Sequence, residues 1–143
     1  MATEASSSQP FSVFWLRRDL RLQDNAALYH ALRSGLPVQP VFILDANILS
    51  ELPAEDRRVA FIVNALQKLQ DELATYGAAL WIEHGKPLDV WSQLVAQWPV
   101  RAVYANEDYE PYAKQRDAAI HQFLQARGVA FNTYKDHVLL AGR

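Results

Sequence analysis

Three short polar stretches hold most of the residues that could do chemistry in this chain of 143 residues. They are Arg17-Arg18-Asp19-Leu20-Arg21, Leu44-Asp45-Ala46-Asn47 and Asn106-Glu107-Asp108-Tyr109-Glu110. Arginine side chains donate hydrogen bonds and carry positive charge, whereas carboxylates accept hydrogen bonds. If these stretches meet, they can bind a small, polar, aromatic ligand. The alternative is that the charged loops are solvated or form ion pairs with one another.

Several familiar kinds of site are excluded by the residues present. The chain has no cysteine, which excludes disulfides, thiol catalysis, iron–sulfur clusters and thiolate zinc sites. Neither a G-x-G-x-x-G dinucleotide motif nor a P-loop occurs. The histidines lack metal-ligand spacing, and no serine outside the polar N-terminal stretch suits a nucleophile with a histidine partner. We therefore predict no metal site and no catalytic residue. The four histidines are His30, His84, His121 and His137.

The overall charge and hydropathy exclude other partners. There are 14 basic and 16 acidic side chains, a net charge of -2, so no broad basic surface is predicted for nucleic acid. The longest apolar runs fall far short of the roughly 20 residues that cross a bilayer. Residues 1–10 are polar and serine-rich, and we expect a disordered leader there rather than a secretory signal. We expect a cytoplasmic, monomeric protein without a membrane partner.

The polar stretches are positioned by alternating strand and helix patterns. Apolar, β-rich runs predict strands over 11–16, 38–44, 79–82, 102–105 and 129–134. Three- and four-residue apolar spacings predict helices over 25–33, 54–76 and 87–98, and from 111 to the glycine at 128. Asp24 is the predicted N-cap of the first helix, and Gly35, Gly77 and Gly128 are predicted helix stops.

Five strands joined by four helices predict one α/β domain with a doubly wound, Rossmann-like, five-stranded parallel sheet. In such sheets, ligands bind beyond the carboxyl ends of the strands, where the strand order reverses. The three polar stretches follow the first, second and fourth predicted strands. We therefore expect the arginine-rich and acidic stretches to meet at one edge of the sheet. Four tryptophans are interpreted as packing residues rather than an electron-transfer chain: Trp15, Trp81, Trp91 and Trp98.

One of these stretches resembles a known family. Residues 14–25 (FWLRRDLRLQDN) closely match F-W-x-R-x-D-L-R-x-x-D-N, which opens members of the DNA photolyase and cryptochrome family. Further similarity follows at 41–45, Arg58, 106–112 and Arg116-Asp117. The resemblance implies that residues 11–138 form the N-terminal α/β antenna-binding domain. Residues 139–143 would begin a linker to a helical domain that binds FAD and has no counterpart in this chain.

The resemblance also implies a cofactor and its contacts. Relatives hold a planar antenna chromophore, which is a folate, a deazaflavin or a flavin, at the strand ends. Transferred position by position, the family's contacts fall on Arg18, Leu44, Asp45, Arg58, Asp108, Glu110 and Arg116. Glu110 is the first choice among them. For each residue the alternative is an ion pair that ties the loops together.

The family further implies the function of the whole protein. The leading hypothesis is a deoxyribodipyrimidine photolyase, a carbon–carbon lyase of DNA repair that uses light to split pyrimidine dimers. The present chain would bind the antenna and would not itself be catalytic, and it would reach FAD and DNA only through the helical domain. A cryptochrome photoreceptor is the alternative, because the two differ chiefly outside this segment. A third hypothesis is a stand-alone nucleotide-binding α/β module.

Overall fold

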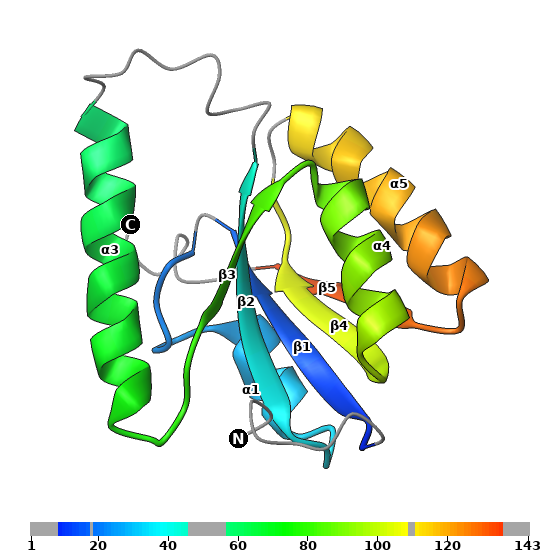
Figure 1. The fold of residues 1–143 in the computed structure, drawn as a ribbon, viewed down its shortest axis with the longest axis horizontal. Coiled ribbons are helices and arrows are strands. Elements are labelled where there is room, and N and C mark those ends of the chain that lie inside the picture. Colours follow the sequence, from blue (N-terminus) through cyan, green and yellow to red (C-terminus); the bar gives the residue numbers. More distant parts are fainter. Residues whose placement is uncertain (1–8, 18, 46–56, 109–110, 136–143) are drawn as a thin grey trace.

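Five parallel strands form one sheet in the order β3-β2-β1-β4-β5 (Figure 1). The computed structural model describes residues 9–17, 19–45, 57–108 and 111–135, with the backbone alone at 57–61 and 112. The predicted linker at 139–143 and residues 1–8 of the predicted leader lie outside these ranges. The strands are β1 (Phe11–Leu16), β2 (Val38–Asp45), β3 (Trp81–Gly85), β4 (Val100–Asn106) and β5 (Ala130–Tyr134). The helices are α1 (Ala26–Leu32), α3 (Arg57–Ala74), α4 (Pro87–Gln97) and α5 (Pro111–Ala126).

The strand order confirms the predicted doubly wound sheet. The chain starts at the central strand β1, moves outward through β2 to β3, and then crosses back to β4 and β5. All four strand pairs are parallel. The order therefore reverses between β1 and β4, and the carboxyl ends of these two strands form the place where α/β sheets bind ligands.

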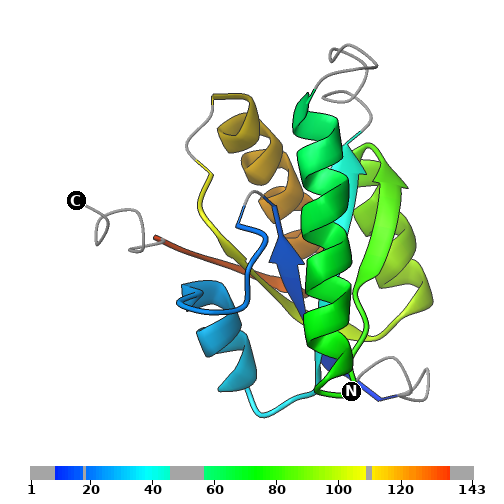
Figure 2. The same cartoon turned by 90° about the vertical axis from the view of Figure 1, so that its left-hand side faces the viewer.

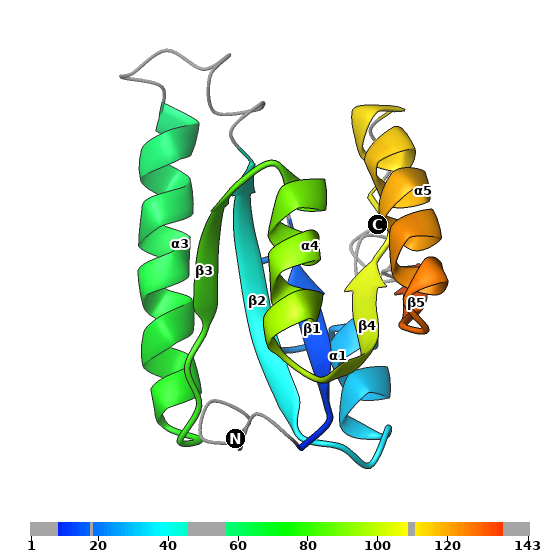
Figure 3. The same cartoon turned by 45° about the vertical axis from the view of Figure 1, so that its right-hand side comes forward.

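Helices cover both faces of the sheet. Figure 2 shows α1 and α3 over one face, and Figure 3 shows α4 and α5 over the other. Side chains alternate along β1, so Val13 and Trp15 join the core under α4 and α5, while Phe14 and Leu16 join the core under α1 and α3. Because β1 is buried on both faces, all six of its residues are buried, including Ser12, as its mostly apolar sequence predicted.

The tryptophans pack as predicted. Trp15 and Trp91 are fully buried and meet edge to face, with ring centroids 5.3 Å apart. Trp81 and Trp98 are partly buried and contact each other and Phe11 at the same core. Aromatic pairs in these tilted arrangements stabilise a core beyond the area that they bury.

Two predicted strands differ from the structure by two or more residues at one or both ends, while the second and fifth differ by a single residue. The third strand was expected over 79–82 but is Trp81–Gly85, which pairs with Val41–Asp45 of β2. The backbone just before it bonds to side chains instead: Gln70 binds both polar groups of Leu80, and Gln39 donates to the carbonyl of Ala79. β4 is longer than the predicted 102–105, because it runs from Val100 to Asn106.

The predicted cap of the first helix is wrong by one residue. Asn25, not Asp24, is the N-cap of α1, and its side chain accepts a hydrogen bond from the backbone N–H of Leu28 at 3.1 Å. Asp24 instead takes a left-handed backbone with φ 51°. The predicted helix stops at Gly35, Gly77 and Gly128 all have positive φ, which is the conformation that ends helices.

None of the helices in the described part of the chain combines the length and the apolar character that a transmembrane span requires.

The buried indole of Trp91 provides a test of the core under α4 and α5. Trp91→Ala removes a fully buried ring and its contact with Trp15, and we expect it to lower the free energy of unfolding by about 3–5 kcal/mol. Leu88→Ala is the control on the same helix, since Leu88 is 43% exposed, and we expect a loss below about 1 kcal/mol. Urea unfolding measures both. Equal losses would contradict the described packing of α4.

Candidate functional site

The arginine-rich and acidic stretches meet at the carboxyl ends of β1 and β4. The Arg17 side chain, just after β1, donates through Nη2 to the backbone carbonyl of Asn106, the last residue of β4. Asn106 in turn donates from Nδ2 to the Asp19 carboxylate at 2.6 Å. The predicted meeting of the two stretches at one edge of the sheet is therefore confirmed. We call this edge the β1–β4 rim.

The buried side-chain amide of Asn106 connects the rim to helix α1. Its Nδ2 donates to Asp19 and also to Asn25 Oδ1 at 2.8 Å, while its Oδ1 accepts from the backbone N–H of Ala27 at 3.0 Å. Asp19 also accepts from Asn25 Nδ2 at 3.1 Å and from the backbone N–H of Arg17 at 3.0 Å. These bonds satisfy one N–H at the start of α1 and fill the space between the strand ends with the chain's own polar groups.

Arg17 brings a buried positive charge to the rim. Its Nη1 lies 2.6 Å from Asp117 Oδ1 of α5, and its guanidinium carbon lies 4.7 Å from the Trp15 ring centre. Burial lowers the pKa of Arg17, and the neighbouring charge of Arg116 lowers it further, whereas the carboxylates of Asp117 and Asp19 raise it. Charges at this depth are tolerated only when they are paired and hydrogen-bonded. The Asp117 carboxylate therefore holds β1 and α5 together.

Arg116 lies beside this pair and reaches the acidic stretch. Its Nε donates to the same Asp117 oxygen at 3.2 Å, and its Nη2 lies 3.9 Å from Asp108 Oδ2. Its guanidinium carbon lies 5.3 Å from the centre of the Trp15 ring, so two arginines contact the same indole. The side chains of Arg116 and Asp108 are each about one-tenth exposed. The structure thus joins two predicted site residues, Asp108 and Arg116, in an ion pair.

The other five predicted site residues differ in how far the structure describes them. Leu44 and Asp45 end β2, with Leu44 half-buried against the α1 and α3 core and Asp45 buried. β2 extends past the last residue of β1, because Leu16 pairs with Phe42. Arg58 lies in the first turn of α3, where the side chain is not described. Arg18 and Glu110 lie outside the described residues.

The predicted set of site residues lacked five residues of the rim: Arg17, Asp19, Asn25, Asn106 and Asp117. Each had a signal in the sequence. Arg17 and Asn106 directly follow or end apolar strands, and the three others stand within the stretches that resemble the family. Arg17 is 89 residues from Asn106 and 100 residues from Asp117 in the chain, so the sequence did not show that these residues pair.

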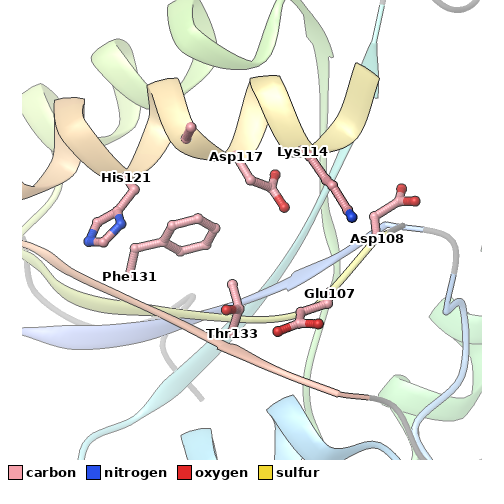
Figure 4. A pocket seen from close by; sticks show the side chains of 8 residues that line it. Glu107, Asp108, Lys114, Asp117, His121, Phe131 and Thr133 are labelled. Carbon is pink, nitrogen blue, oxygen red and sulfur yellow. The ribbon is translucent and has the colours of Figure 1, made fainter. Parts of the chain in front are cut away.

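An open cavity of about 380 Å³ adjoins the rim between α5 and the ends of β4 and β5 (Figure 4). Carboxylates and a lysine line one end, and aromatic rings line the other, where His121 meets Phe131 edge to face. Its size suits a small organic ligand. The lining residues are Glu107, Asp108, Lys114, Asp117, Ala118, His121, Phe131 and Thr133.

Two further observations concern a second cavity and metal-ligand groups. A second cavity, of about 310 Å³, lies between β3 and α4 and contains none of the predicted site residues. Within the described ranges, no group of three or more histidine, aspartate or glutamate side chains is arranged to hold a metal ion. The carboxylates of the rim therefore act through ion pairs and hydrogen bonds in the contacts that the structure describes.

The amide of Asn106 provides a test of the rim. Asn106→Ala removes three hydrogen bonds and leaves their buried partners unpaired, and we expect it to lower the free energy of unfolding by about 2–3 kcal/mol. Asn132→Ala is the control on β5, since its amide makes one long bond of 3.5 Å to the carbonyl of Val103. We expect a loss below about 1 kcal/mol there. Urea unfolding measures the free energy of unfolding of both variants. Comparable losses in the two would contradict the role of Asn106.

Comparison with known proteins shows the family of this chain. The family model described as DNA photolyase matches residues 12–142. Cryptochrome-2 of Gallus gallus is 35% identical over 141 residues, which cover 97% of this chain and 24% of that protein. The deoxyribodipyrimidine photo-lyase of a Synechococcus species is 37% identical over 117 residues, which cover 82% of this chain and 24% of that protein.

Solved structures give the same result. An archaeal photolyase from Sulfolobus tokodaii, described as containing two FAD molecules, superposes with a TM-score of 0.81 and 37% identity over 88% of this chain. A bacterial class III photolyase from Agrobacterium tumefaciens superposes with a TM-score of 0.79 and 27% identity over 94% of it. The chain covers between 27% and 29% of these two structures and about a quarter of the two sequence relatives. It belongs to the DNA photolyase family.

Proposed function

We propose that this chain is the light-harvesting, antenna-binding domain of a deoxyribodipyrimidine photolyase, with the domain spanning residues 11–138 and a linker beginning at 139. The supporting observation is the buried, charged β1–β4 rim, where Arg116 pairs with Asp108 and Asp117. Among the proposed contacts that the structure describes, Asp108 also lines the adjoining open cavity of about 380 Å³. A light-harvesting pigment needs a site that fixes its orientation, excludes water and pairs its polar edges. A buried network of ion pairs and hydrogen bonds supplies the rigidity that such a site requires.

The proposed pigment is a planar conjugated ring of the folate, deazaflavin or flavin class. The Asp108 and Glu110 carboxylates would accept hydrogen bonds from ring N–H groups, and the arginines would stack on the ring or donate to its carbonyls. The proposed contacts are Arg18, Leu44, Asp45, Arg58, Asp108, Glu110 and Arg116. The Sulfolobus tokodaii photolyase, whose two FAD molecules are described as implying a novel light-harvesting cofactor, is the reason to include a flavin in the test.

The remaining steps of the reaction belong to other parts of the full-length protein. The bound pigment would absorb light and pass the energy to FAD in a C-terminal helical domain, which would bind DNA and split the pyrimidine dimer. The present chain would hold and orient the pigment and would not be catalytic. A net charge of -2 agrees with DNA being bound elsewhere in the full-length protein. A cytoplasmic location and a monomeric state stay predictions.

A cryptochrome photoreceptor is the second candidate for the full-length protein. The 35% identity to Gallus gallus Cryptochrome-2 over 97% of this chain favours it. The two candidates are separated by light-dependent repair of pyrimidine dimers in DNA by the full-length protein. Repair under blue light supports the photolyase, and a flavin-containing protein without repair activity supports the cryptochrome.

The carboxylates of the acidic stretch provide the test of antenna binding. We expect the domain to bind at least one of FAD, 5,10-methenyltetrahydrofolate and a 5-deazaflavin, with a shifted near-ultraviolet or blue absorption band. Asp108→Ala with Glu110→Ala should weaken that binding by roughly 100-fold or more, because each of the two charged hydrogen bonds contributes about 1.5–3 kcal/mol. Absorption titration measures the affinity.

A matched control removes two carboxylates from the surface of α3, at Asp71→Ala with Glu72→Ala, and should bind like the unmodified domain. Failure of the unmodified domain to bind any of the three pigments would refute the proposal. Binding that is unchanged by the Asp108 and Glu110 substitutions would refute the site but not the family.

A further inference from the structure

A single carboxylate oxygen accepts hydrogen bonds from two arginines at the β1–β4 rim. Asp117 Oδ1 lies 2.6 Å from Arg17 Nη1 and accepts from Arg116 Nε at 3.2 Å. The side chains of Arg17, Arg116 and Asp117 are 5%, 10% and 18% exposed. All three are therefore largely shielded from water, so that the charges interact more strongly than they would at the surface.

The two guanidinium groups are close to each other because both bind Asp117 Oδ1, and both also contact the Trp15 ring, at 4.7 Å and 5.3 Å from its centre. Like charges in this position repel each other, and burial adds the cost of removing them from water. The Asp117 carboxylate lies where it offsets both effects. If its charge is removed, the guanidinium of Arg116 loses the contact that fixes its Nε edge.

The orientation of Arg116 determines what it presents to the acidic stretch. With Nε held by Asp117 and the face of the guanidinium on Trp15, Nη2 lies 3.9 Å from Asp108 Oδ2. Figure 4 shows Asp108 and Asp117 at the same end of the cavity, together with Glu107 and Lys114. A displaced Arg116 would therefore change the position and the electrostatic surroundings of the Asp108 carboxylate.

We infer that Asp117 is a positioning residue for the antenna site, because its bridge between Arg17 and Arg116 fixes the guanidinium whose charge faces Asp108 at 3.9 Å. This inference rests on the proposed function, in which Asp108 contacts the pigment directly. Asp117 acts through Arg116 and need not touch the pigment itself. The bridge also links the site to β1, since Arg17 directly follows that strand.

The test is a double-mutant cycle on pigment affinity in the complete 143-residue chain. The variants are Asp117→Asn, Asp108→Asn and their combination, titrated with FAD, 5,10-methenyltetrahydrofolate and a 5-deazaflavin by absorption. We expect each single substitution to weaken binding of the pigment by roughly ten-fold. Adding Asp117→Asn to Asp108→Asn should weaken it by less than about two-fold more, because residues that act through one another are not additive.

The control is Asp71→Asn on the exposed surface of α3, where the carboxylate bonds Gln67 of the same helix. It should leave affinity unchanged. Asp117→Glu covers the case in which Asp117→Asn does not fold, because it keeps the charge and moves the carboxylate by one methylene group. We expect it to weaken binding by about three-fold with Asp108 present and to have no effect in the Asp108→Asn background.

The outcomes separate this inference from the proposed function. Absence of binding by the unmodified chain overturns both. Binding that is weakened by Asp108→Asn but unaffected by the Asp117 substitutions overturns the positioning role alone. A purely structural role predicts the same loss with and without the Asp108 carboxylate, and that result would also overturn the inference.

Discussion

The buried Arg17 guanidinium constrains the arrangement of the whole β1–β4 rim. A positive charge that leaves water needs a counter-charge and partners for its N–H groups, or the fold loses stability. Asp117 of α5 supplies the counter-charge and binds Nη1, the carbonyl of Asn106 binds Nη2, and Trp15 supplies an aromatic face. These contacts hold β1, β4 and α5 in one relative position. Displacing any of them would leave a charge unpaired in the interior.

Hydrogen bonds of two side-chain amides extend this constraint to the opposite face of the sheet. Asn106 reaches from the end of β4 to the first turn of α1, and Asn25 caps that helix while bonding Asn106 and Asp19. The strand ends between the two faces are thus occupied by polar side chains that satisfy one another. The open space next to the rim lies instead towards α5 and β5, where carboxylates, a lysine and two aromatic rings line the cavity.

The proposed binding of a pigment agrees with this division between a filled rim and an adjoining cavity. Transfer of excitation energy depends on a fixed distance and orientation of the donor, and a network of paired charges resists motion of the side chains proposed to contact it. Asp108 and Arg116, two of the proposed contacts, are themselves paired at 3.9 Å. An ion pair and a ligand contact were predicted as alternatives for these two residues. They are compatible, because Arg116 can orient the Asp108 carboxylate while that carboxylate contacts a ligand.

Local sequence determined the elements of this protein, and the tertiary structure decided their partners. The bounds of β1 followed from a mostly apolar run, and the helix ends at Gly35, Gly77 and Gly128 followed from the backbone freedom of glycine. The start of β3 was wrong because Gln70, on another element, binds the backbone of Leu80. Likewise, the resemblance of residues 14–25 pointed to the family, but the bridge from Arg17 to Asp117 joins residues 100 positions apart. Periodicity reports which face of an element is buried, whereas only the folded chain brings a distant carboxylate to a buried arginine.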